Sequence, residues 1–218
     1  MKIQQTADGS PTLYLPEIDE HYHSVHGAVQ ESQHVYLDAG FNQSAARPVR
    51  VLEMGFGTGL NVLLTALEAE RRSVPVIYTA LEKYPLPPET TNQLDYTVGD
   101  RSLFQAIHRA KWGEPTTLMP CFSLKKIETD FNAFDYSEPY DVVYYDAFAP
   151  DKQPEVWSQA LFDALFAAMN AGGVLTTYCA KGVVRRMMLQ SGFQVERIAG
   201  PAGKREMLRA RKCPNEDR

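Results

Sequence analysis

VLEMGFGTGLN, residues 51–61, decides the fold of this 218-residue chain. Residues 49–54 form a short run with β-branched residues, which predicts a buried strand. Three glycines at alternate positions follow it. Apolar residues then recur at helical spacing over residues 60–70, so we expect the strand to turn through the glycines into a helix. Glycine permits such a turn and a close approach of backbone to a ligand. The start of the helix adds unpaired N–H groups and the positive end of its dipole.

Glu53, the last acid before the glycines, favours one kind of cofactor. The glycine spacing departs from the dinucleotide-binding pattern, which needs a glycine at its sixth position, here Leu60. A carboxylate at this place would repel a pyrophosphate. It suits the positively charged end of S-adenosylmethionine, with its ammonium and sulfonium groups. We therefore expect S-adenosylmethionine rather than NAD.

The rest of the chain alternates strands with helices. Further strands are predicted over 74–81, 123–129, 140–145 and 174–179, helices over 103–111, 154–170 and 181–190, and a hairpin over 193–198 and 205–209. This alternation predicts a mostly parallel sheet covered on both faces, to which the hairpin adds one antiparallel strand. Residues 84–120 are treated as an insertion. We divide the chain into an N-terminal extension, residues 1–48, and a main domain, residues 49–218.

Four acids, Glu53, Glu82, Asp130 and Asp146, stand at the ends of predicted strands. Ligands of open α/β sheets bind beyond these ends. Glu82 lies near the spacing at which an acid accepts hydrogen bonds from a ribose diol. Asp130 is expected to accept from the adenine amino group. Asp146 follows the central strand and is expected to face the transferred methyl group.

The charge of the chain is unevenly distributed. Its net charge is −5, yet residues 181–218 carry ten Lys and Arg against four acids. A basic segment on an acidic body is compatible with an edge that faces phosphates, although a solvated basic face explains the same pattern.

Other classes of protein find no support in the sequence. No long apolar run predicts a membrane span and no apolar segment opens the chain, so we expect a cytoplasmic protein without a membrane partner. The three cysteines stand far apart, which predicts neither disulfides nor a zinc site. The histidines at 21, 23, 26 and 34 are interpreted as surface or substrate contacts, and no metal is expected.

A resemblance to a known family is carried by residues 144–157, YYDAFAPDKQPEVW. This segment resembles the DGFAP-x-K-NP-x-x-W stretch of the MnmC-type tRNA methyltransferases, with Ala147 where glycine is usual. Residues 55–64, 81–86 and 204–208 (GFGTGLNVLL, LEKYPL and KREML) are similar to further motifs of the family, and residues 27–36 resemble its G-x-x-E-S-x-x-V-F entry segment. The resemblance spans roughly residues 20–210.

The resemblance implies a fold and a reaction. The fold is that of a Rossmann-like class I S-adenosylmethionine-dependent methyltransferase, with a seven-stranded, mostly parallel sheet and one antiparallel strand. The reaction converts 5-aminomethyl-(2-thio)uridine at the tRNA wobble position to the 5-methylaminomethyl form. Bifunctional members carry a fused flavin-dependent oxidase that this sequence lacks, so a stand-alone methyltransferase is expected. The resemblance leaves open a separate FAD-dependent oxidase that acts upstream.

The strand-end pattern and the resemblance together assign roles to individual residues. Asp146 is the candidate catalytic residue, which orients the amine and accepts its proton directly or through water. The candidate cofactor-binding residues are Glu53, Gly55, Phe56, Gly57, Thr58, Gly59, Asn61, Glu82, Lys83, Asp130, Phe131 and Asp146. The candidate substrate-binding residues are Glu31, His34, Phe148, Tyr178, Lys181, Arg185, Arg186, Lys204 and Arg205.

Contacts with the anticodon loop are expected of two kinds. Phe148 and Tyr178 would stack the base, with plain packing as the other explanation for both aromatic side chains. The basic residues would contact phosphates, and anticodon loops allow a base to be splayed out at low cost.

Two alternatives remain open. An aminopropyltransferase of the spermidine-synthase type has the same fold and a strand-end aspartate, and it also alkylates an amine from a sulfonium donor. The segment DAFAPDKQPEVW and the basic C-terminal segment argue against it. A non-catalytic module that binds tRNA or a nucleotide is the other alternative, and the strand-end acids argue against that one.

Overall fold

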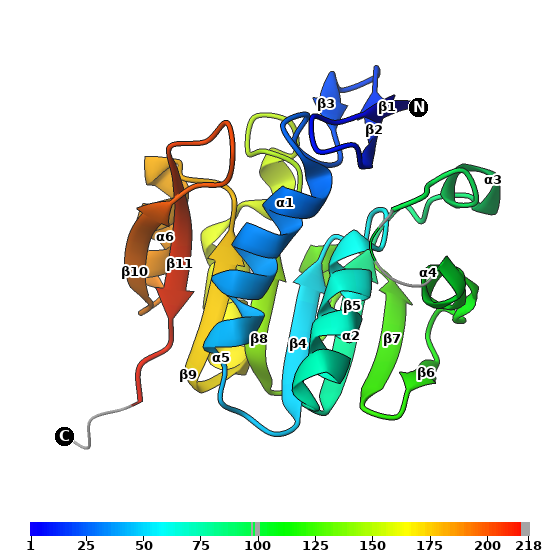
Figure 1. The fold of residues 1–218 in the computed structure, drawn as a ribbon. Coiled ribbons are helices and arrows are strands. Elements are labelled where there is room, and N and C mark those ends of the chain that lie inside the picture. The colour runs from blue at the N-terminus through cyan, green and yellow to red at the C-terminus, as the bar shows by residue number, and fades with distance from the viewer. Residues whose placement is uncertain (97, 99–100, 215–218) are drawn as a thin grey trace.

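One large sheet dominates the computed structural model, which describes residues 1–96, 98 and 101–214. Within these residues, eight strands pair in the order β10-β11-β9-β8-β4-β5-β7-β6 (Figure 1). Their bounds are β4 (Val49–Met54), β5 (Val76–Glu82), β6 (Pro115–Met119), β7 (Phe122–Glu128), β8 (Tyr140–Tyr145), β9 (Met169–Thr177), β10 (Gln194–Ala199) and β11 (Glu206–Arg211). The five central strands β7, β5, β4, β8 and β9 run parallel, whereas β11 pairs antiparallel with both of its neighbours.

The predicted fold class is confirmed, and the sheet has one strand more than the seven expected. The additional strand, β6, pairs antiparallel with β7 at the sheet edge and lies inside the stretch treated as an insertion. Its residues are exposed or half-buried, so the sequence lacks the apolar alternation that marks a buried strand. The helix predicted over 154–170 ends earlier, at Ala168, and Gly172 and Gly173 lie within β9.

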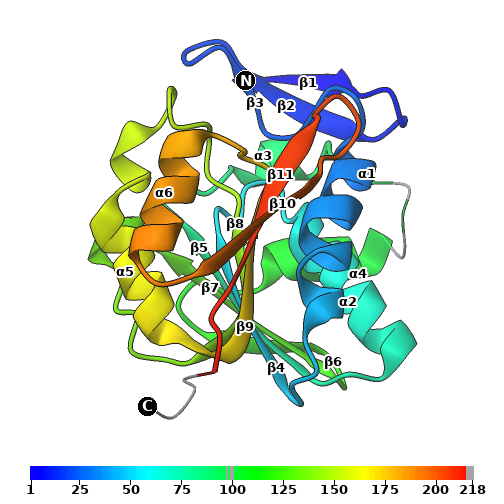
Figure 2. The same cartoon turned by 90° about the vertical axis from the view of Figure 1, so that its left-hand side faces the viewer.

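Helices cover both faces of the sheet (Figure 2). Two of them, α5 (Gln159–Ala168) and α6 (Gly182–Gln190), lie on one face, and α1 (Ala28–Ser32), α2 (Leu60–Arg72) and α4 (Arg101–Arg109) lie on the other. Among the described residues, the helical elements are completed by the short α3 (Pro88–Thr91), a π-helical segment (Gln33–Asp38) and three 3₁₀ turns (Phe41–Gln43, Phe131–Ala133 and Pro154–Val156). No helix in the described ranges is long and apolar enough to cross a bilayer.

The core lies on both sides of the sheet because the central strands are buried on both faces. Val51 and Tyr144 belong to the apolar cluster under α1 and α2, and Leu52 and Tyr145 belong to the cluster under α5 and α6. This two-sided burial explains why apolar residues occupy successive positions in both strands, Val51 and Leu52 in β4 and residues 142–145 in β8.

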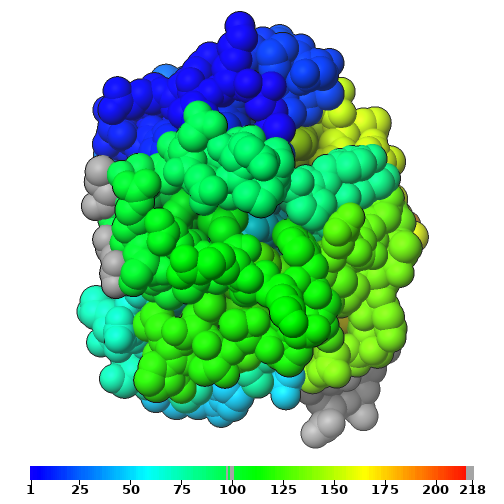
Figure 3. Space-filling model, turned by 90° about the vertical axis from the view of Figure 1, so that its right-hand side faces the viewer, coloured from blue at the N-terminus to red at the C-terminus, as the bar shows by residue number. Residues whose placement is uncertain are grey.

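Residues 1–27 form a small antiparallel sheet of β1 (Lys2–Gln5), β2 (Pro11–Leu15) and β3 (Glu20–His21). This sheet lies over the carboxyl ends of the parallel strands, at the top of Figure 1, and forms the top of the face seen in Figure 3, above the green residues that follow β5. The N-terminal extension also contains α1, which continues as the π-helical segment. The division of the chain at residue 48 stays a prediction. Leu13 and Tyr36 belong to the same apolar cluster as Val51, so the N-terminal residues share a core with the main domain.

Candidate active site

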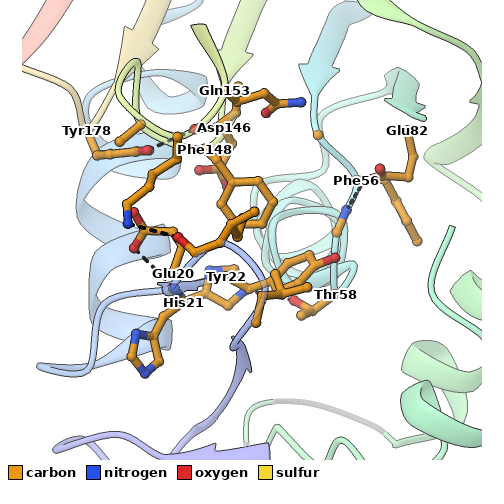
Figure 4. A pocket seen from close by; sticks show the side chains of 18 of the residues that line it. Glu20, His21, Tyr22, Phe56, Thr58, Glu82, Asp146, Phe148, Gln153 and Tyr178 are labelled. Carbon is orange, nitrogen blue, oxygen red and sulfur yellow. Dashed lines mark hydrogen bonds between the residues drawn. The ribbon is translucent and has the colours of Figure 1, made fainter. Parts of the chain in front are cut away.

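A cavity of about 700 Å³ opens at the carboxyl ends of the central strands, beneath the N-terminal sheet. The glycine-rich turn, the loop after β8, the N-terminal sheet and the β10–β11 turn all contribute to its wall. In the view of Figure 4, Glu82 and Tyr178 lie on opposite sides, with Phe148 between them. The cavity is therefore built from segments that are far apart in the sequence.

The glycine-rich turn brings bare backbone to the cavity wall. Gly55, Gly57 and Gly59 have φ angles of 103°, 48° and 76°, a region that disfavours other residues. A Cβ atom on Gly55 would lie 2.7 Å from the carbonyl oxygen of Asp146, so this glycine also permits a close approach between two loops. Gly59 does not line the cavity and instead begins α2 as its N-cap residue.

The carboxylate of Glu82 lines the cavity at the end of β5. The backbone N–H of Gly57 donates to its Oε2 at 3.0 Å and that of Tyr84 donates to its Oε1 at 2.9 Å. Burial raises the pKa of Glu82, against these backbone donors. These donors fix the carboxylate in place, and its two oxygens together still have room to accept from a ligand.

Asp146 lines the cavity at the end of β8. The hydroxyl of Tyr36 donates to its Oδ1 at 2.5 Å, and the Nδ2 of Asn61 donates to its Oδ2 at 2.9 Å. Burial raises the pKa of Asp146 to about 7, although both hydrogen bonds favour the charged form. The carboxyl group therefore exchanges its proton near neutral pH, as a general base requires.

Glu53 is fully buried and does not line the cavity. Its side chain projects on the same side of β4 as Val51, toward α2, because side chains alternate along a strand. The Nδ2 of Asn61 donates to its Oε1 at 3.0 Å, and burial raises the pKa of Glu53 well above its usual range. The structure places Glu53 behind Asn61, which does line the cavity. Its predicted cofactor role would have to be exerted through Asn61.

Asp130 also lies outside the cavity wall, whereas Lys83 and Phe131 line it. The Nζ of Lys83 donates to Oδ2 of Asp130 at 2.7 Å, and the backbone N–H of Asn132 donates to its Oδ1 at 2.9 Å. The pKa of Asp130 is lowered, mainly by the bond from Lys83. A contact with adenine stays a prediction for this residue.

Four predicted substrate residues come together in the cavity: Glu31, Phe148, Tyr178 and Lys204. The Nζ of Lys204 pairs with Oε1 of Glu31 at 2.6 Å and lies 4.0 Å from the ring centroid of Tyr178. The hydroxyl of Tyr178 donates to the carbonyl oxygen of Ala147 at 2.8 Å. One acid and one cation thus border an aromatic surface beside Asp146.

The other predicted substrate residues lie outside the cavity. His34 contacts the carbonyl oxygen of Ala199 at 2.8 Å, and Lys181 forms an ion pair with Asp151. Lys181 precedes α6, which carries Arg185 and Arg186 and covers the sheet rather than the cavity, and Arg205 follows Lys204 in the β10–β11 turn. The proposed phosphate contacts of these residues stay predictions.

The sequence interpretation named His21 and His23 only as surface or substrate contacts and missed that the N-terminal sheet lines the cavity. The Nε2 of His23 contacts Oγ1 of Thr58 at 2.7 Å, and burial lowers the pKa of His23 to about 4. Tyr22 meets the ring of Phe148 edge-on at 5.2 Å. Lys152 donates across the cavity mouth to the carbonyl oxygens of Ile18 and Asp19, at 2.8 and 3.1 Å. These contacts join distant segments, and no local pattern indicates them.

Comparison with known proteins places the chain among methyltransferases. Residues 121–213 match a family described as S-adenosyl-L-methionine-dependent methyltransferase. The bifunctional protein MnmC for tRNA 5-methylaminomethyl-2-thiouridine biosynthesis is 31% identical over 214 residues in Idiomarina loihiensis, covering 87% of this chain and 35% of that protein. The Cupriavidus necator protein of the same name is 33% identical over 218 residues, covering 93% and 33%. The chain thus spans about a third of the length of these relatives.

Among solved structures, MnmC2 from Aquifex aeolicus superposes with a TM-score of 0.77 at 27% identity, covering 98% of this chain and 71% of that one. Spermidine synthase from Thermotoga maritima superposes with a TM-score of 0.59 at 11% identity, covering 96% and 71%. The second likeness concerns the fold alone.

Proposed function

The chain belongs to the MnmC-type S-adenosyl-L-methionine-dependent methyltransferases, and on that premise we propose that it methylates the amine of 5-aminomethyl-(2-thio)uridine at the tRNA wobble position. The product is the 5-methylaminomethyl nucleoside. The names of the relatives support this substrate. The observation that carries the proposal is the Asp146 carboxyl group, which lines the cavity beside an aromatic surface and has a pKa of about 7.

The residues of the cavity fit S-adenosylmethionine. Backbone without side chains lies along one wall, and a volume of about 700 Å³ is within the range of pockets that enclose small ligands. The glycine-rich turn, Asn61 and Glu82 would hold it, with Glu82 on the ribose. When bound, S-adenosylmethionine supplies a methyl group whose bond to sulfur breaks, the electron pair going to sulfur, as the lone pair of the acceptor nitrogen forms the new bond.

Asp146 acts on the acceptor amine in this transfer. A protonated amine has no lone pair, so the nitrogen must first lose a proton. The ionised carboxylate of Asp146 accepts that proton, directly or through water, and a pKa near 7 matches the task at neutral pH. Tyr36 and Asn61 hold its two oxygens and so orient the carboxylate. Precise placement of the nitrogen in line with the methyl group contributes the remaining rate acceleration.

The remaining predicted residues bind the tRNA in this proposal. Phe148 and Tyr178 line the cavity and would stack an extruded base. Lys181, Arg185, Arg186 and Arg205 would contact phosphates outside the cavity, together with Lys204 at its edge. A cytoplasmic location and a separate FAD-dependent oxidase that acts upstream stay predictions from the sequence.

A methylation assay tests the proposed function. The protein is incubated with methyl-labelled S-adenosylmethionine and tRNA from a strain that lacks the modification, and label is expected on the wobble nucleoside. A parallel reaction with decarboxylated S-adenosylmethionine and a polyamine tests for aminopropyl transfer. Aminopropyl transfer to the polyamine, or no label on tRNA, would contradict the proposal.

Glu82→Gln is expected to weaken binding of S-adenosylmethionine by about tenfold, because the amide offers one acceptor oxygen where the carboxylate offers two charged ones. Equilibrium binding measured by calorimetry checks this value. Glu89→Gln, on the exposed α3, is the matched control and should bind like the wild type. Equal affinities of wild type and Glu82→Gln would remove Glu82 from the cofactor site.

The pH dependence of the reaction should report the ionisation of Asp146. Below its pKa of about 7 the carboxyl group is protonated and accepts no proton. We therefore expect kcat/KM for tRNA to fall about tenfold for each pH unit below 7, since this parameter follows the free enzyme. A profile that stays level between about pH 5.5 and 7 would exclude Asp146 as the proton acceptor.

A further inference from the structure

Tyr36 contacts the candidate catalytic residue from a segment that the sequence interpretation did not connect with it. It lies in the π-helical segment Gln33–Asp38 and is only 1% exposed. Single π-helical turns insert an extra residue into a helix and occur often at functional sites, because they redirect a side chain. Here the redirected side chain is Tyr36, whose hydroxyl donates to Oδ1 of Asp146 at 2.5 Å.

Several charged or polar groups from different elements surround Asp146. Glu31 on α1 and Lys204 in the β10–β11 turn act through their charges, and they oppose one another. Buried Glu53 on β4 and the phenol of Tyr178 after β9 also face it. Within the described residues, hydrogen bonds to the carboxylate of Asp146 come only from Tyr36 and Asn61.

These two donors are not equivalent. Asn61 uses the same nitrogen, Nδ2, for Asp146 and for Glu53, at 2.9 and 3.0 Å. Tyr36 has a single proton and gives it to Asp146 alone. Burial, followed by the charge of Asp146, raises the pKa of Tyr36 well above its usual range, so its phenol remains a donor throughout the working pH range.

We propose that Tyr36 is a positioning residue, whose hydroxyl fixes the orientation of the Asp146 carboxylate and favours its ionised form. The proposal rests on the proposed function. The ring of Tyr36 packs against Tyr144 at a centroid distance of 5.2 Å and fills the core, but packing does not need the hydroxyl. Removing the hydroxyl alone therefore separates the two roles.

Tyr36→Phe keeps the ring and removes the hydroxyl. A hydrogen bond to a charged group is strong enough for its loss to raise the pKa of Asp146 by about one unit or more. Carboxyl ¹³C resonances of labelled aspartate report the pKa of Asp146 in the free protein as the midpoint of its titration. The resonance of Asp146 is assigned from the spectrum of Asp146→Asn. We also expect kcat at pH 7 to fall about tenfold, to recover in part near pH 9, and binding of S-adenosylmethionine to stay within about threefold.

Tyr144→Phe is the matched control. Its hydroxyl is also fully buried and contacts Oγ1 of Thr65 at 3.1 Å, and its ring lies beside that of Tyr36, but it makes no bond to Asp146. It should keep the wild-type midpoint and pH profile. Incorporation of 3-fluorotyrosine at position 36 retains the packing and strengthens the donor, so it should lower the midpoint and thus move it in the opposite direction.

An unchanged or lowered midpoint in Tyr36→Phe overturns the proposal, as does an equal shift in Tyr144→Phe. If Tyr36→Phe fails to fold, the titration midpoint of Asp146 in the fluorotyrosine variant tests the proposal instead, and a midpoint that is not lowered overturns it. The titration needs no tRNA, so it tests Tyr36 even where the wild type fails to methylate tRNA. That failure would instead count against the proposed function.

Discussion

Asp146→Ala is expected to lower kcat for tRNA methylation by about 100- to 10,000-fold while leaving the affinity for S-adenosylmethionine within about threefold of the wild type. The large effect on turnover follows because the variant has lost the group that takes the proton from the acceptor nitrogen. The small effect on binding follows because the glycine-rich turn and Glu82 form the other cavity wall without help from the Asp146 side chain.

Single-turnover kinetics with saturating S-adenosylmethionine, beside calorimetric binding, measure the two quantities separately. Asp135→Ala is the control, since its exposed carboxylate contacts only Ser137 among the hydrogen bonds of the described residues. Turnover that survives in Asp146→Ala would show that the proton leaves by another route. A large loss of binding would instead give Asp146 a role in holding the cofactor.

Gly55→Ala should destabilise the protein by roughly 3 kcal/mol or more and abolish binding of S-adenosylmethionine. A left-handed conformation costs a residue with a Cβ atom about 1–2 kcal/mol. At this position the new carbon would also lie 2.7 Å from the carbonyl oxygen of Asp146, which is backbone and has little freedom to move. Relief of the overlap would push the glycine-rich turn away from the loop after β8, so the cavity would lose its shape.

Gly113→Ala separates these two causes. Gly113 has a comparable φ of +81° but open space where its Cβ atom would lie. We expect Gly113→Ala to be destabilised only by the cost of the left-handed conformation and to bind S-adenosylmethionine normally. Denaturant unfolding and calorimetry of both variants measure the difference, and equal destabilisation would mean that the contact between the two loops is unimportant.

Local patterns were sufficient to predict much of the fold. The sequence GFGTGLN after a β-branched run predicts a strand, a turn and a helix, because glycine content and apolar periodicity are properties of neighbouring residues. The position of Asp146 in the cavity follows in the same way, since parallel strands all end at one edge of the sheet. Strand β6, which the sequence did not predict, shows the limit of this reasoning. An edge strand without alternating buried residues leaves no periodic signal in the sequence.

Side-chain direction was harder to predict than position. Glu53 stands at a strand end as Asp146 does, but its side chain projects under α2 rather than into the cavity. Tyr36 is directed at Asp146 by a π-helical turn, and ordinary helical periodicity does not indicate one. Both outcomes depend on packing between distant segments, so a pattern of neighbouring residues is insufficient to predict them.

The ion pair between Lys204 and Glu31 joins residues that are 173 positions apart in the chain. During synthesis on the ribosome, Glu31 emerges long before its partner, and the cavity has one side missing until the last two strands have been made. Contacts of such long range slow folding. We therefore expect nascent chains that stop before β11 to lack the substrate side of the cavity, so that methyl transfer becomes possible only after β11 has been made.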